Sequence, residues 1–163
     1  MFRIGLGQDS HEFVADAENK PLILGGITVD EKGGLKGNSD GDAILHSLCN
    51  ALSSAIGGDS LSTWTDEMCN VQGIKDSACY VEHILNKTVG LKYSVVNVSI
   101  SVEAKTPRLK MEIIKQIKER IASLLKIQID QVGLTFTSGE GLTEFGLGKG
   151  INVLTIVNIA RHD

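Results

Sequence analysis

Apolar and polar positions along the chain repeat with two periods, one typical of strands and one typical of helices. Alternation, or a run rich in Val, Ile and Ser, predicts four longer strands. These strands are expected at Phe2–Phe13, Tyr93–Glu103, Val132–Thr137 and Ile151–Ala160. A shorter segment, Leu22–Val29, contains the pair Gly25-Gly26 and predicts a hairpin or a bent strand.

Helical spacing predicts three helices. The first is expected over Ala43–Ile56, after the capping segment Ser39–Asp42 and before Gly57-Gly58. The second follows Asp76-Ser77 and ends near Val89, before Gly90. The third is expected to begin near Pro107, and it carries an apolar stripe made of Ile113, Ile114, Ile117, Ile121, Leu124 and Leu125.

The remaining stretches predict loops, and the whole pattern predicts the fold class. Loops are expected at Lys32–Asn38, at Asp59–Lys75, which has no clear period, and at the glycine-rich segment Ser138–Gly150. Strands and striped helices mixed along one chain predict an α+β fold. We expect a two-layer sandwich, a mixed β-sheet with helices on one face, in a single domain spanning residues 1–163.

Composition narrows the possible functions. Of the 163 residues, 42% are hydrophobic, which suffices for a packed core, and the net charge of -4 argues against a nucleic-acid-binding surface. No apolar run is long enough for a membrane span, and the N-terminus lacks a secretion signal. The three cysteines, Cys49, Cys69 and Cys79, have no paired spacing and fit free thiols in a reducing compartment. We therefore expect a cytoplasmic protein, or a plastid protein if a transit peptide has been removed.

Three side chains could hold a metal ion. Asp9 and His11 lie two positions apart on the first predicted strand, so both side chains point to the same face. His46 lies one turn after Asp42 on the first predicted helix. Three N/O ligands with an open fourth position are typical of a catalytic zinc site. Asp-x-His alone is weak, since such a pair on a strand is more often solvated, and His83 and His162 have no partner motif at all.

Three further segments could contact phosphate. Asn38–Asp42 precedes a helix, where backbone N–H groups can bind an anion, although a simple helix cap is the favoured interpretation. Ala104–Arg108 offers two cations and a hydroxyl at a strand-to-helix junction, or else a solvated basic turn. Thr137–Gly141 offers two hydroxyls, and Glu140 there could hold a second hard cation such as Mg²⁺.

These segments together resemble the 2-C-methyl-D-erythritol 2,4-cyclodiphosphate synthase family. The matching motifs extend from Arg3 to the last strand, so the resemblance covers essentially the whole chain, and the combination is more specific than any one motif. In order, they are Gly5-x-Gly7-x-Asp9-x-His11, Ile23-Leu24-Gly25-Gly26, Ser39-Asp40-Gly41-Asp42-x-x-x-His46, Gly58-Asp59, Asp76-Ser77, Ala104-x-x-Pro107 and Thr137-x-x-Glu140.

The resemblance implies a lyase of isoprenoid precursor synthesis. The implied reaction closes 4-diphosphocytidyl-2-C-methyl-D-erythritol 2-phosphate into 2-C-methyl-D-erythritol 2,4-cyclodiphosphate and releases CMP. The implied assembly is a homotrimer with active sites between subunits. Asp9, His11 and His46 would bind zinc or a similar ion, and Glu140 would hold Mg²⁺ or Mn²⁺ on the diphosphate.

The resemblance also implies which residues bind substrate. Thr137 and Ala104–Arg108 match the surroundings of the cytidine and its phosphates, and Asp59 matches a residue that binds the methylerythritol hydroxyls. Asp66 falls in a mobile loop over that end of the substrate. The full implied set of substrate-binding residues is Asp9, His11, Asn38, Ser39, Asp59, Leu61, Asp66, Ala104, Lys105, Thr106, Pro107, Arg108, Thr137, Ser138 and Glu140, with Asn38 and Ser138 at the catalytic positions.

The chain departs from the family pattern around the substrate while the metal triad is intact. Asn38 replaces a usual His, so it can donate a hydrogen bond but cannot carry charge. Ser138 replaces a Thr and keeps the hydroxyl, and Arg108 stands where Lys is common. The remaining departures are Leu61 for a Gly, Glu144 and Leu147 for an aromatic residue and an Arg, and an altered segment Trp64–Gly73. We expect a divergent, active member; the alternatives are a zinc-dependent phosphate-ester hydrolase and a non-catalytic metal- or isoprenoid-binding homologue.

Overall fold

The computed structural model describes residues 1–15 and 19–162. Within these ranges the main sheet contains β1 (Phe2–Glu12), β4 (Tyr93–Glu103), β5 (Val132–Thr137) and β6 (Gly150–Arg161) in the order β1-β6-β4-β5. The β1–β6 and β6–β4 pairs are antiparallel, and the β4–β5 pair is parallel. The predicted mixed sheet is therefore confirmed.

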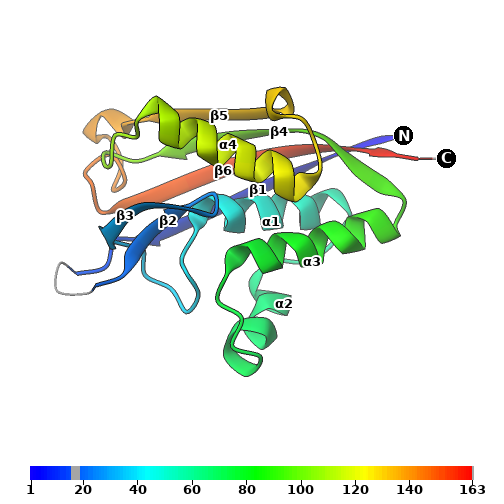
Figure 1. Ribbon diagram of the computed structural model, residues 1–163, viewed down its shortest axis with the longest axis horizontal. Coiled ribbons are helices and arrows are strands. Elements are labelled where there is room, and N and C mark those ends of the chain that lie inside the picture. The colour runs from blue at the N-terminus through cyan, green and yellow to red at the C-terminus, as the bar shows by residue number, and fades with distance from the viewer. Residues whose placement is uncertain (16–18, 163) are drawn as a thin grey trace.

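Three longer helices cover one face of this sheet, which confirms the two-layer α+β prediction. They are α1 (Ala43–Ala55), α3 (Ser77–Gly90) and α4 (Met111–Leu125), and Figure 1 shows α1 running along β1 with α3 beside it. A hairpin of β2 (Pro21–Leu24) and β3 (Ile27–Gly33) turns at Gly25-Gly26, where both residues have positive φ. Short 3₁₀ turns occur at Ile129–Gln131 and Gly139–Gly141.

Asp42 joins the start of α1 to this hairpin. Its side chain is fully buried and accepts hydrogen bonds from the backbone N–H groups of Leu45, Gly25 and Gly26. Burial raises the pKa of Asp42 to about 6, and the three N–H donors oppose that rise. Because the chain's own carboxylate caps this helix N-terminus, the capping interpretation is correct. The Leu45 N–H that Asp42 accepts from is not free to bind a phosphate.

A seam of small residues brings α1 unusually close to β1. A Cβ atom added to Gly7 would lie 2.1 Å from the Ser47 carbonyl oxygen, and one added to Gly5 would lie 1.9 Å from that of Ala51. Two residues along a strand advance about 6.6 Å, and four along a helix advance about 6 Å. The next inward-facing strand position, Asp9, is therefore level with the first turn of α1, where His46 lies.

The opposite face of the sheet is exposed and partly apolar. The side chains of Phe2, Ile4 and Leu6 on β1 and of Leu154 and Ile156 on β6 are between 41% and 71% exposed. A contiguous apolar patch of this kind marks an interaction surface more often than a free surface.

In the described part of the chain, no helix is long and apolar enough to cross a membrane.

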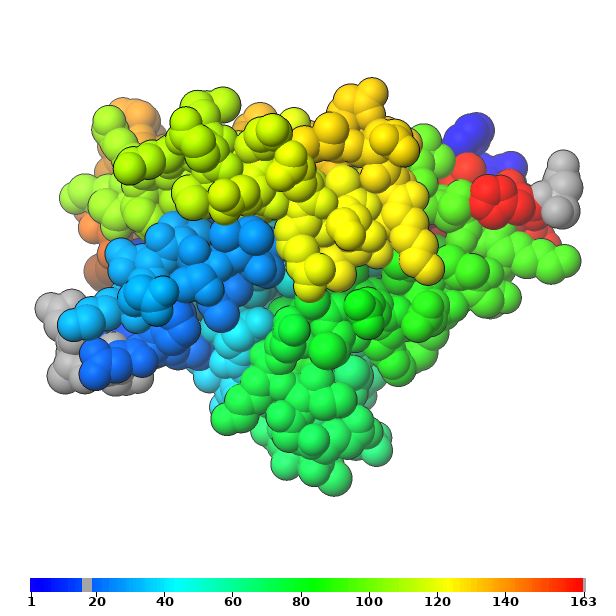
Figure 2. Space-filling view, viewed as in Figure 1, coloured from blue at the N-terminus to red at the C-terminus, as the bar shows by residue number. Residues whose placement is uncertain are grey.

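Two predicted elements are wrong. The expected loop Asp59–Lys75 contains a short helix, α2 (Ser62–Asp66), which continues into a π-helix at Glu67–Val71. These helices are too short to show a hydrophobic period, and they are held by contacts distant in sequence, including Trp64 stacked on His83 at 5.1 Å. Figure 2 shows this green segment projecting from the body of the molecule.

The third helix begins later than expected, at Met111 instead of near Pro107. Lys110 is extended, with ψ of 152°, and Leu109 packs against the core. The partial burial of Leu109 thus favours an extended approach to the helix. As a consequence, the basic segment Ala104–Arg108 ends before the first helical amides, and it is not the helix N-terminus that the pattern predicted.

Candidate metal centre

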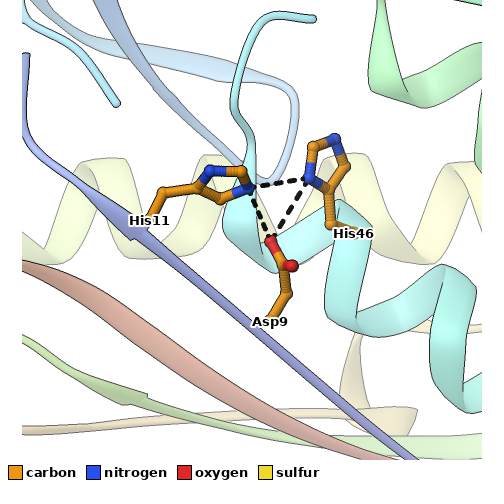
Figure 3. A group of neighbouring side chains, drawn as sticks. All are labelled: Asp9, His11 and His46. Atoms are coloured by element: carbon orange, nitrogen blue, oxygen red, sulfur yellow. Dashed lines mark hydrogen bonds and ion pairs between the residues drawn. The ribbon is translucent and has the colours of Figure 1, made fainter. Parts of the chain in front are cut away.

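Asp9, His11 and His46 converge on one point. His11 Nε2 lies 2.8 Å from Asp9 Oδ2, His46 Nδ1 lies 3.3 Å from the same oxygen, and the two nitrogens are 3.1 Å apart. Figure 3 shows the strand β1 carrying Asp9 and His11 on one face and helix α1 presenting His46 to them. The alternation of the strand and the glycine seam beneath α1 together create this meeting point.

The donor set fits a divalent cation. One anionic oxygen and two imidazole nitrogens face each other, and their lone pairs repel unless a proton or a cation lies between them. Asp9 Oδ2 is buried, and it faces both ring nitrogens, His11 Nε2 and His46 Nδ1. One carboxylate with two imidazoles is a common ligand set for zinc, and three protein ligands leave coordination positions for substrate or water.

Electrostatics in the triad couple metal binding to protons. Burial alone would raise the pKa of Asp9, but hydrogen bonds and charge from His11 and His46 outweigh it, so that pKa is lowered. The Asp9 carboxylate raises the pKa of His11, against the opposing effect of burial. In the metal-free protein His11 therefore keeps its proton to higher pH than an ordinary histidine.

We expect zinc affinity to be greatest above the raised pKa of His11 and to fall as the pH decreases through it. Below that pKa the metal must displace a proton, so the apparent association constant should fall by up to about tenfold per pH unit for each proton displaced. Competition titrations against a chromogenic chelator at a series of pH values measure this. A His162→Ala variant, altered at an exposed position, should give the same profile; a flat profile in the unaltered chain would contradict the assignment of His11.

A pocket of about 170 Å³ surrounds the triad. It includes four other residues that the sequence predicted, Asn38, Ser39, Leu61 and Asp66. The sequence interpretation missed residues that come from the unexpected helical segment and from α3: Ser62, Thr65, Cys69 and Tyr80. Ser62, Thr65 and Cys69 gave no signal because residues 59–75 have no period, and Tyr80 lies on a helix whose spacing does not show which residues reach the pocket. Asp66 belongs to α2 and not to a loop.

Asp59 lies in a neighbouring hollow with Leu6, Gly7 and Gln8. The same hollow includes Asn50 and Ser54 of α1, so Asp59 lies beside β1 and α1 but is not among the residues that line the metal pocket. Both hollows lie beside β1. Gly58–Ser60 line the hollow that contains Asp59, and the metal pocket takes its lining from the following segment, which begins at Leu61.

Two of the three predicted phosphate segments, Ala104–Arg108 and Thr137–Gly141, lie together and outside the pocket around the triad. The Ala104 N–H donates to the Thr137 carbonyl at 3.0 Å, and the Lys105 N–H donates to that of Phe145 at 3.2 Å. Thr106 and Pro107 line a separate hollow with Phe13 and Lys32. Both loops lie entirely within the described ranges, and neither contributes a residue to the pocket around the triad.

Glu140 is held in the second of these loops. It has a positive φ of 48°, and its carboxylate accepts a hydrogen bond of 2.7 Å from Ser138 Oγ. Glu140 is exposed to solvent. One chain thus presents a metal half, made by the triad and its pocket, and a loop half, made by Ala104–Arg108 and Thr137–Glu140.

Comparisons with known proteins agree across the whole chain. The YgbB family matches residues 2–160. A 2-C-methyl-D-erythritol 2,4-cyclodiphosphate synthase of Chlamydia trachomatis serovar L2b is 39% identical over 165 aligned positions, covering 99% of this chain and 92% of that protein. The synthase of the same name from Chlamydia caviae is 35% identical, covering 99% and 91%.

Solved structures show the same fold. An IspF of Plasmodium falciparum in complex with CDP superposes with a TM-score of 0.84 at 26% identity, covering 99% of this chain and 97% of that one. The bifunctional IspDF of Campylobacter jejuni gives a TM-score of 0.84 at 29% identity and covers all of this chain but 43% of that one.

Proposed function

This chain belongs to the YgbB family, and we propose on that basis that it is a metal-dependent lyase that converts 4-diphosphocytidyl-2-C-methyl-D-erythritol 2-phosphate to 2-C-methyl-D-erythritol 2,4-cyclodiphosphate and CMP. The observation that carries the proposal is the convergence of Asp9, His11 and His46 in a pocket that also contains Asn38 and Ser39. A full-length match to synthases and an intact metal triad support the same reaction, in the non-mevalonate route to isoprenoid precursors.

The proposed reaction forms one phosphorus–oxygen bond and breaks another. An oxygen of the 2-phosphate attacks the β-phosphorus, and the bridging oxygen leaves with CMP. Because the nucleophile belongs to the substrate, the protein mainly positions the groups and stabilises developing charge. A divalent ion bound by the triad would supply positive charge for the phosphate oxygens.

We assign zinc to the triad and Mg²⁺ or Mn²⁺ to Glu140. Two imidazoles with one carboxylate suit zinc, whereas a lone carboxylate that shares its ion with phosphate oxygens suits a harder cation. Asn38 and Ser138 stand at the catalytic positions, where the Asn38 amide can donate a hydrogen bond to a phosphate oxygen and the Ser138 hydroxyl can do so when it turns away from Glu140. The cytidine and its phosphates would contact Ala104–Arg108 and Thr137, and Asp59 with Asp66 would hold the methylerythritol hydroxyls.

We further infer that the active unit is a homotrimer in which neighbouring chains complete each site. The pocket around the triad is smaller than the about 300–1,000 Å³ of typical complete ligand pockets. The loop half lies elsewhere on the chain, and the exposed apolar patch of β1 and β6 offers a surface for a second copy.

Three free thiols, two of them buried, support a cytoplasmic location.

A phosphorus NMR assay tests the proposed reaction. The protein is incubated with 4-diphosphocytidyl-2-C-methyl-D-erythritol 2-phosphate, Zn²⁺ and Mg²⁺, with and without a chelator. We expect chelator-sensitive release of CMP together with a cyclic diphosphate. A linear, hydrolysed product would identify a phosphate-ester hydrolase instead, and the absence of turnover by zinc-loaded protein would favour a non-catalytic homologue.

Leu6→Lys is expected to dissociate the assembly and to reduce activity by more than about tenfold. Leu6 is 60% exposed in the apolar patch and pairs with Ile156 on β6, so a charge there would have to be buried at the interface between copies. Sedimentation velocity measures the mass. Val89→Lys, which places the same charge on an exposed apolar position of α3, should sediment like the unaltered chain. A Leu6→Lys protein of unchanged mass would refute this interface.

A further inference from the structure

The ring nitrogen of His46 that faces away from the triad has its own partner. His46 Nε2 lies 2.8 Å from Ser77 Oγ, and both side chains are buried. Ser77 is the first residue of α3, 31 positions further along the chain. Helix α3 therefore contacts the metal ligand directly, although none of its residues belongs to the triad.

The single hydroxyl proton of Ser77 is already used. Ser77 Oγ donates to Asp40 Oδ1 at 2.5 Å, and the backbone N–H of the same residue donates to Asp40 Oδ2 at 2.9 Å. The Asp42 N–H also donates to Asp40 Oδ1, at 3.1 Å. Both oxygens of Asp40 thus accept hydrogen bonds, and Ser77 can offer His46 only a lone pair.

We infer that Ser77 and Asp40 are positioning residues that fix the tautomer of His46, with the proton on Nε2 and the lone pair of Nδ1 directed at the metal position. A ring nitrogen facing a lone pair must donate, so the neutral ring carries its proton on Nε2. Nδ1 is then the metal-binding nitrogen, and it is the one that faces Asp9 Oδ2 and His11 Nε2. Outer partners of this kind hold metal-binding histidines in orientation.

Ser39 is the competing partner. Its Oγ lies 3.3 Å from His46 Nε2 and 3.4 Å from the Gly41 N–H. Both contacts are longer than those of Ser77, and within residues 1–15 and 19–162 no carboxylate accepts a hydrogen bond from the Ser39 hydroxyl. The geometry therefore favours Ser77 as the acceptor, and Ser39 supplies a matched control.

The inference rests on the metal site of the proposed function but not on the reaction, so it is tested by metal binding and by NMR. Removing an outer partner typically weakens metal affinity about 10–100-fold. We expect Ser77→Ala to bind Zn²⁺ and Co²⁺ about 10–100-fold more weakly than the unaltered chain does. The metal affinity of Ser39→Ala should stay within about threefold of that of the unaltered chain. Circular dichroism and the melting temperature show whether each variant is folded.

Asp40→Asn provides a second variant that leaves the contacts of the triad in place. An asparagine side chain has one neutral acceptor oxygen, whereas the Asp40 carboxylate accepts from the Ser77 hydroxyl and from the backbone N–H groups of Ser77 and Asp42. The Ser77 proton is therefore held less firmly and can turn toward His46. We expect this to shift the neutral ring toward the Nδ1–H tautomer and to weaken Zn²⁺ binding. The ¹⁵N chemical shifts of the His46 ring in metal-free protein distinguish the two tautomers directly.

The outcomes separate this inference from the proposed reaction. Nε2–H in the unaltered chain, with weaker zinc binding in both variants, supports the inference whether or not the protein turns over the substrate. Nδ1–H in the unaltered chain overturns it. Unchanged zinc affinity in folded Ser77→Ala, or an equal loss in Ser39→Ala, overturns it as well, even for a fully active synthase.

Discussion

Replacing His46 with alanine is expected to abolish tight zinc binding and to lower kcat/KM by at least about 1,000-fold, the equivalent of about 4 kcal/mol of transition-state stabilisation. His46 supplies one of the three converging donor atoms, and without it Asp9 Oδ2 is left with His11 alone. Two remaining ligands do not hold a zinc ion against a chelator. The loss should therefore appear equally in metal content and in turnover.

The chain should remain folded after this change. His46 lies in the first turn of α1, whose cap and core contacts are made by other residues. Removing a buried imidazole side chain of this kind lowers the free energy of unfolding by about 1–3 kcal/mol. Metal analysis after dialysis, the phosphorus NMR assay and thermal melting measure the three quantities, with His162→Ala as the control. Normal turnover by His46→Ala would show that the triad assignment is wrong.

Gly7→Ala is expected to lower the free energy of unfolding by more than about 4 kcal/mol, beyond the range of ordinary overpacking. The new methyl group would lie 2.1 Å from the Ser47 carbonyl oxygen and 2.3 Å from the Ala51 backbone nitrogen. Both atoms belong to the backbone of α1, so no side-chain rotation relieves the clash. The helix must move away from β1, or the chain must unfold.

The displacement should also weaken metal binding, because α1 carries His46 while β1 carries the other two ligands. Urea unfolding and zinc titration measure the two effects. Gly133→Ala on β5 is the matched control: its added Cβ would lie no closer than 3.5 Å to another atom, so it should be nearly neutral. Gly7→Ala with unaltered stability would contradict the close approach of helix and strand.

The sequence predicted the parts of this molecule that depend on local periodicity. Asp9 and His11 were placed on one face by the two-residue repeat of a strand, and the segment Ser39–Asp42, which contains the observed cap Asp42, was identified as a capping segment by its position before an apolar stripe. The pair Gly25-Gly26 predicted a hairpin or a bent strand, and the structure has the hairpin, with positive φ at both glycines.

Features that depend on contacts distant in sequence were not predictable in this way. The helical segment Ser62–Val71 has no period of its own and depends on Trp64 packing against α3. Ser77 was identified only as part of a helix cap, since nothing in its spacing shows that its hydroxyl would meet His46. The late start of α4 likewise accompanies the packing of the partly buried Leu109, which depends on the assembled core.

The separation of the metal half from the loop half has a genetic consequence. In a homotrimer whose sites form between neighbouring chains, His46→Ala damages one side of each site and Lys105→Ala the other. Co-expression of the two inactive chains would then rebuild intact sites wherever an undamaged metal half faces an undamaged loop half. Two loss-of-function alleles of this gene would therefore complement each other, whereas either allele alone, or two alleles that damage the same half, would not.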